Sequence, residues 1–109
     1  PLNVCLQLNI DYEETKSGLN EIELEEFLDR TKNLENIKIR GLMVIPKPRE
    51  SLEEQKKIFR AVKEIYLSLN NKGSNFDSLS MGMTSDYAAA IQEGATMVRI
   101  GTGIFGPRK

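Results

Sequence analysis

The 109-residue sequence contains no histidine and no tryptophan, and it has a single cysteine, Cys5. One cysteine excludes a disulfide within the chain, and the lack of histidine excludes a zinc site built from cysteine and histidine. Histidine is also the commonest general base in enzymes, so any acid–base chemistry must rely on lysine, tyrosine, carboxylates or a cofactor. We expect neither a metal site nor a disulfide framework.

The sequence also lacks an excess of charge and long apolar runs. Its 15 basic and 16 acidic side chains give a net charge of −1, which removes the electrostatic reason to expect a nucleic acid or an anionic membrane as partner. No apolar run approaches the ~20 residues that a membrane span needs. We therefore expect a cytoplasmic protein with neither kind of partner.

Apolar segments and helical stripes alternate along the chain. Segments bounded by glycine, proline or polar residues predict four strands, at residues 2–10, 37–45, 76–80 and 96–100. Two helices are predicted to begin with capping boxes at Asn20 and Ser51, and a shorter third helix is predicted over residues 85–93. The order βαβαβαβ predicts a parallel sheet with helices outside it.

The length allows one domain and favours an incomplete one. A closed eight-unit (β/α)8 TIM barrel of ~250 residues has about 31 residues per unit, so the chain corresponds to about three and a half units. We expect a single partial domain over residues 1–109, with an open four-stranded α/β sheet as the alternative. The start beside a strand without a methionine, and the end just after a glycine-rich turn, favour the partial barrel.

Two glycine-rich segments follow neighbouring predicted strands, residues 80–86 (SMGMTSD) and residues 99–106 (RIGTGIFG). In barrels, the loops after the last strands commonly bind phosphate, because helix N-terminal N–H groups favour an anion and glycine allows close approach. Thr84, Ser85 and Thr102 add uncharged hydroxyl donors. Each segment alone is more often a helix cap or a turn, but the two together predict a phosphate site.

Arg99 lies in the last predicted strand, which should be largely buried. A buried guanidinium needs a partner. That partner is either a carboxylate such as Asp77 or Asp86, or a bound ligand toward which the side chain points.

Lys47 follows the strand predicted over residues 37–45, where a barrel enzyme can carry a Schiff-base lysine. A nucleophilic lysine needs desolvation, however, and a loop position between two prolines favours a solvated side chain. Asp11 and Lys16 follow the first predicted strand and are interpreted as loop charges.

At these residues the chain resembles the YggS-type pyridoxal 5′-phosphate (PLP)-binding proteins, the PLP homeostasis family related to the barrel domain of alanine racemase. The matching pieces cover almost the whole chain in order, and the last two are the most specific. They are VCLQLN (4–9), KSG (16–18), IRGLM (39–43), LSMGMTSD (79–86) and VRIGT with IFG (98–106).

The resemblance implies a cytosolic barrel of PLP fold type III that holds PLP and helps to balance vitamin B6 pools, with this chain as its C-terminal half. By position, it implies that two pairs of residues hold the phosphate, Ser80 with Thr84 and Gly101 with Thr102. Met81 and Gly82, in the same turn, are implied to bind the cofactor as well, and Arg99 is implied to face the pyridine nitrogen. An arginine there weakens the ring as an electron sink, which fits a carrier better than a carbanion catalyst.

The family's Schiff-base lysine is expected upstream of Pro1, so we expect no catalytic residue in this chain. The missing N-terminal half of the barrel is the expected partner. Alone, the half-barrel should expose two sheet edges and an uncovered core, and should be poorly soluble. The alternatives are a fold-type III PLP-dependent amino-acid racemase, a phosphate-binding barrel enzyme such as an aldolase using Lys47, and an interaction module without a ligand.

Overall fold

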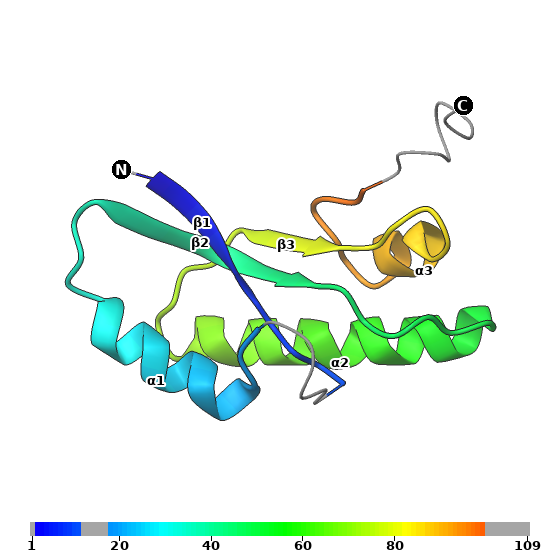
Figure 1. Ribbon diagram of the computed structural model, residues 1–109, viewed down its shortest axis with the longest axis horizontal. Helices are drawn as coiled ribbons and strands as arrows, with labels where there is room; N and C mark the ends of the chain where they lie inside the picture. The colour runs from blue at the N-terminus through cyan, green and yellow to red at the C-terminus, as the bar shows by residue number, and fades with distance from the viewer. Residues whose placement is uncertain (1, 12–17, 100–109) are drawn as a thin grey trace.

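The computed structural model describes residues 2–11 and 18–99. Its elements alternate along the chain, as Figure 1 shows: β1 (Leu2–Gln7), α1 (Glu21–Thr31), β2 (Ile37–Val44), α2 (Leu52–Asn71), β3 (Ser78–Met81) and α3 (Tyr87–Gln92). The strands are parallel in the order β1-β2-β3, and α1 and α2 lie together below the sheet in this view. The predicted α/β fold class is confirmed.

The predicted fourth strand over residues 96–100 is wrong for the described part of the chain, where the segment forms only an isolated parallel bridge between Ser80 and Met97. The amides of Thr96 and Met97 donate to the carbonyl of Leu79 at 2.9 and 3.3 Å. The Thr96 hydroxyl accepts the Leu79 N–H at 2.7 Å. In a regular β-sheet this N–H would donate to a backbone carbonyl of the neighbouring strand. The segment therefore lies against β3 without continuing the sheet.

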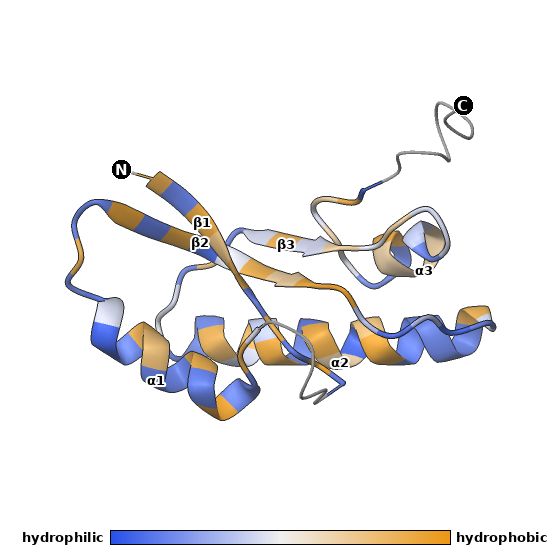
Figure 2. Ribbon diagram, in the orientation of Figure 1, coloured by the Kyte–Doolittle hydropathy of each residue, from blue (hydrophilic) through white to orange (hydrophobic). Residues whose placement is uncertain are grey.

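The two longer helices, α1 and α2, begin at the predicted capping residues. The Asn20 side chain accepts the Glu23 N–H at 2.9 Å, and the Glu23 carboxylate accepts the Asn20 N–H at 3.1 Å. The Ser51 hydroxyl accepts the Glu54 N–H at 3.1 Å at the start of α2. Figure 2 shows polar and apolar residues alternating along α2, and its apolar stripe is buried at Phe59, Val62, Tyr66 and Leu69.

The sheet has one face against the helices and one face without them. Leu6, Leu42 and Leu79 are lateral neighbours, and the last two are fully buried. The next residue of each strand points to the opposite face, and these residues form the row Gln7, Met43 and Ser80. This row is mostly polar and half-buried.

The β1–β2 pair contains a register shift, and the next residue of β2, Gly41, lies very close to β3. Val4 pairs with Ile39 but Cys5 pairs with Gly41, which leaves Arg40 as an extra residue in β2. A Cβ on Gly41 would lie 1.6 Å from the backbone oxygen of Ser78, a distance that no side chain tolerates. Glycine is therefore required at this position.

We expect the Gly41→Ala variant to lower the free energy of unfolding by about 3 kcal/mol or more, because the backbone of β3 must move away. Gly73→Ala is the comparison, since Gly73 has a positive φ but no atom within 4 Å of the added Cβ. Urea unfolding measures both. Equal losses in the two variants would contradict the proposed backbone clash.

An ion pair joins β2 to the residue before β3. Arg40 Nε donates to Asp77 Oδ1 at 2.9 Å, and a second guanidinium nitrogen binds Asp77 Oδ2. The hydrogen bonds from Arg40, and one from the Ser78 hydroxyl, lower the pKa of Asp77 to about 2. The pair lies at the amino end of β3 and is partly exposed, so solvent weakens it.

Because the folded-state pKa of Asp77 lies below its ordinary value of 3.8, its stabilising contribution is present above about pH 4 and is lost as the pH falls toward 2. We expect the wild-type protein to have a higher urea midpoint of unfolding than Asp77→Asn at pH 6. The difference between the two midpoints should be smaller at pH 2. A gap that does not depend on pH would contradict this assignment.

Candidate functional site

The candidate site lies at the carboxyl end of β3, where the chain turns into α3 (Figure 1). Gly82, the first residue after β3, has a φ of +105°, a conformation that favours glycine. An added Cβ would lie 2.6 Å from the Cβ of Ala90 and 3.1 Å from Cγ1 of Val98. Glycine thus lets the turn lie directly against α3 and against the segment that leads to Arg99.

Residues 82–86 belong to the segment that the sequence predicts to bind phosphate, and we name them the phosphate turn for that prediction. Reciprocal hydrogen bonds close the turn. Oδ1 of Asp86 accepts the Met83 N–H at 2.7 Å, and the Asp86 N–H donates to the Met83 carbonyl at 3.1 Å. The Asp86 side chain therefore bonds back into the turn and makes no capping bond to α3. This explains why α3 begins at Tyr87, two residues later than predicted.

The side chains that were predicted to bind the cofactor near the end of β3 lie in different environments. Ser80 is half-buried on the face of the sheet without helices, and Thr84 and Ser85 are exposed. The side chain of Met81 is buried in the core, and its N–H donates to the Met97 carbonyl at 3.1 Å. Met81 therefore fixes the end of β3, while its neighbours present hydroxyl groups at the surface.

Arg99 is exposed, so the expectation of a buried guanidinium is wrong. Its backbone N–H donates to the carbonyl of Gly82 at 2.9 Å. This bond brings the start of the second glycine-rich segment directly onto the phosphate turn. Gly101 and Thr102, the remaining predicted phosphate residues, lie outside the described residues.

The two carboxylates considered as partners of Arg99 are engaged elsewhere. Asp77 binds Arg40 at the other end of β3, and Asp86 accepts the amide of Met83. Within residues 2–11 and 18–99, no ion pair involves Arg99.

The loops after β1 and β2 hold a cluster that the sequence pattern does not reveal. Asp11, interpreted above as a loop charge, has a side chain only 8% exposed and pairs with Arg49 Nη2 at 2.6 Å. It also accepts the backbone N–H of Lys47 at 2.6 Å. Asp11 and Arg49 are 38 positions apart, and no local spacing signals such a pair.

The Lys47 side chain is exposed, as the sequence interpretation favours. It lacks the desolvation that a nucleophilic lysine needs. Lys16, the other lysine near the strand ends, lies outside the described residues.

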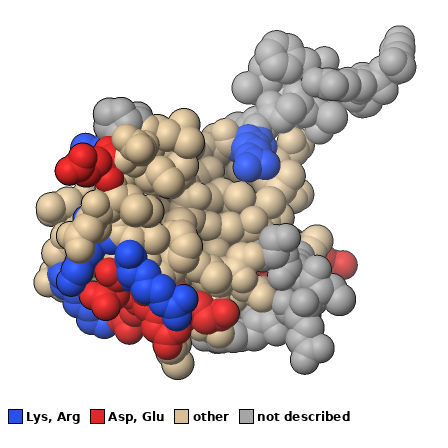
Figure 3. Space-filling view, turned by 60° about the vertical axis from the view of Figure 1, so that its left-hand side comes forward, with Lys and Arg blue, Asp and Glu red and all other residues tan. Residues whose placement is uncertain are grey.

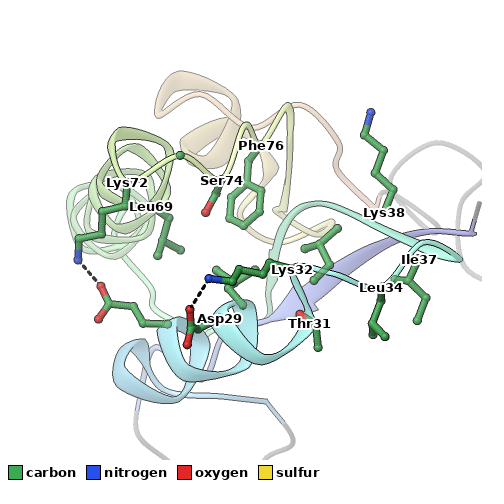
Figure 4. A pocket seen from close by; sticks show the side chains of 14 residues that line it. Asp29, Thr31, Lys32, Leu34, Ile37, Lys38, Leu69, Lys72, Ser74 and Phe76 are labelled. Atoms are coloured by element: carbon green, nitrogen blue, oxygen red, sulfur yellow. Dashed lines mark hydrogen bonds and ion pairs between the residues drawn. The ribbon is translucent and has the colours of Figure 1, made fainter.

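A cavity of about 620 Å³ lies away from these residues, between the end of α1, the start of β2 and the end of α2. Figure 4 shows Leu69 and Phe76 beside it, with ion pairs from Lys72 to Glu25 and from Lys32 to Asp29.

Figure 3 shows charges of both signs gathered at the level of the helices, and the middle of that face is uncharged. No described group of three or more cysteine and carboxylate side chains fits a metal ion, and no helix among the described residues suits a membrane span.

The family of the alanine racemase N-terminal domain matches residues 1–109. The chain belongs to this family. The pyridoxal phosphate homeostasis proteins of Pseudomonas aeruginosa and Escherichia coli K12 are 47% and 43% identical to it over 108 residues, which cover 99% of this chain and 46% of each relative. The predicted resemblance is thereby confirmed.

Solved structures confirm that the fold belongs to this barrel family. PipY of Synechococcus elongatus PCC7942, determined with PLP bound, aligns with a TM-score of 0.80 and 32% identity over 95% of this chain and 49% of PipY. PipY without PLP aligns with a TM-score of 0.85. The chain spans about half the length of the relatives that it matches.

We expect Asp86→Ala to lower the free energy of unfolding by about 1 kcal/mol, because the Met83 amide loses its acceptor. Exchange of the Met83 amide hydrogen should become faster, and Asp86→Asn should retain most of the protection because it keeps Oδ1. Asp29→Ala, which removes an exposed ion pair on α1, is the control. Unchanged Met83 exchange in Asp86→Ala would contradict the turn geometry.

Proposed function

We propose that this chain supplies the phosphate-binding part of a PLP-binding protein with a role in PLP homeostasis. The observation that carries the proposal is the hydrogen bond from the Arg99 amide to the Gly82 carbonyl. It joins the two glycine-rich segments that were expected to hold one phosphate. The names of the relatives and the PLP in the PipY structure agree with this function.

The described residues fit the phosphate end of PLP. Gly82 is buried and has no room for a side chain, so the turn packs closely against α3 and carries Thr84 and Ser85 at the surface. Ser80 and Thr84 offer hydroxyl donors near this backbone, and Arg99 offers a positive charge. By the resemblance, Gly101 and Thr102 complete the phosphate site.

Binding and orientation, rather than turnover, are the proposed roles of this chain. PLP, when bound, supplies the electron sink for reactions of amino acids, and the protein tunes that property. Lys47 is exposed and unsuited to nucleophilic chemistry, which disfavours an aldolase-like function. The lysine that anchors PLP in the family is proposed to come from the other half of the barrel.

The partial domain over residues 1–109 is proposed to combine with that other half. The chain covers 46% of its curated relatives and 49% of PipY, and β1 lies at an edge of the described sheet. A cytoplasmic location without nucleic acid or membrane partners belongs to the same proposal, and the net charge of −1 supports the absence of an electrostatically recruited partner.

A chimera tests the proposal directly: this chain replaces the matching 49% of PipY, whose structure contains PLP. We expect the chimera to bind PLP, and we expect Thr84→Val to weaken binding by about 10-fold or more, because one hydrogen bond to a charged group is lost. Fluorescence titration measures the dissociation constant.

Thr84→Ser keeps the hydroxyl and should retain the affinity of the parent chimera. Thr31→Val, on α1, is the matched control and should also leave PLP affinity unchanged. A folded chimera that does not bind PLP, or a Thr84→Val variant with unchanged affinity, would overturn the assigned phosphate site.

A further inference from the structure

We propose that Gln55 is a positioning residue for the phosphate turn. Its side-chain amide connects the turn to the loop after β2, which Asp11 holds in place. The hydrogen bonds of Gln55 are observed in the structure, whereas their effect on PLP binding rests on the proposed function.

The first step is the fixed loop between β2 and α2. The Asp11 carboxylate accepts the backbone N–H of Lys47 and a guanidinium N–H of Arg49, both at 2.6 Å. Arg49 Nη1 also donates to the Lys47 carbonyl at 2.9 Å. Because the Asp11 side chain is only 8% exposed, solvent screens these bonds weakly. The backbone around Arg49 is therefore held at several points.

The second step is the side chain of Gln55, in the first turns of α2. Its Nε2 donates to the Arg49 carbonyl at 2.7 Å and, more weakly, to the Ser85 carbonyl at 3.5 Å. Both partners are acceptors, so the amide nitrogen, and not the amide oxygen, must face them. One side chain thus spans from the fixed loop to the phosphate turn.

The third step is the set of anchors on the phosphate turn. The Gly82 carbonyl is held by Arg99, the Met83 amide by Asp86, and the Ser85 carbonyl by Gln55. Thr84 lies between the second and third anchors. Its orientation toward a ligand therefore depends on both neighbours. The Gln55 anchor comes from α2, whereas Asp86 and Arg99 follow β3 in the chain.

The helix that carries Gln55 is itself firmly placed. α2 has 20 residues and buries its apolar stripe in the core. Arg60, further along α2, binds the Glu93 carboxylate after α3 at 3.0 and 3.1 Å. The α2–α3 packing therefore stays in place when the Gln55 bonds are removed, and a change at Gln55 should loosen the turn locally.

Gln55→Glu is the test, because it keeps the shape but places an oxygen opposite two carbonyl oxygens. A glutamate near a helix N-terminus is otherwise favourable, so α2 itself should not be weakened. Gln92→Glu, which adds the same charge at the exposed end of α3, is the control, and Gln55→Ala is the second variant. Amide hydrogen exchange is measured on the ligand-free PipY chimera, followed by PLP titration.

We expect exchange at residues 83–86 to rise about 10-fold in both Gln55 variants, while Leu42 in β2 keeps its protection and Gln92→Glu changes nothing. PLP affinity should fall several-fold without a matching fall in the urea midpoint. Unchanged exchange at 83–86, an equal rise throughout the protein, or unchanged PLP affinity would overturn the inference. A local rise in exchange in a chimera that binds no PLP would support the connection and refute the proposed function.

Discussion

The candidate site depends on the absence of a side chain at Gly82. A Cβ on Gly82 would collide with Ala90. Because glycine has none, the end of β3 lies against α3, and the Gly82 carbonyl accepts the amide of Arg99. Without this close approach, the two glycine-rich segments would be separated by the width of a side chain. This one constraint brings the backbone of Arg99 onto the turn that carries Thr84, and it is the feature on which the proposed phosphate site rests.

Polar contacts connect the loops at the carboxyl ends of the strands, whereas apolar packing holds the layer beneath them. The core between sheet and helices contains Leu42, Leu79 and Phe59, all fully buried. Above it, the Asp11 carboxylate joins the loops after β1 and β2, and the Gln55 amide joins α2 to the second of these loops. This division is typical of barrels, in which the scaffold provides stability and the loops after the strands provide function.

Periodicity and capping patterns predicted the elements that rest on local interactions. The starts at Asn20 and Ser51, and the buried stripe of α2, follow from spacings within one or two helical turns. The errors arose where a distant group competes with a local pattern: the Thr96 hydroxyl takes a ladder donor of Leu79, and the Asp86 side chain turns back to Met83 instead of capping α3. Asp11 and Arg49 were not predicted as a pair, because a contact between residues 38 positions apart leaves no periodic signal. Gly101 and Thr102 lie outside the described residues, so their assignment rests on the glycine-rich pattern and on the resemblance.

The central claim is that this chain recognises the phosphate of PLP, and the most direct measurement compares PLP with pyridoxal, which has the same ring and no phosphate. Both are titrated into the barrel that contains this chain. Several charge-assisted hydrogen bonds to the phosphate, each contributing about 1.5–3 kcal/mol, predict that pyridoxal binds at least about 100-fold more weakly. Equal affinities for PLP and pyridoxal would contradict the account.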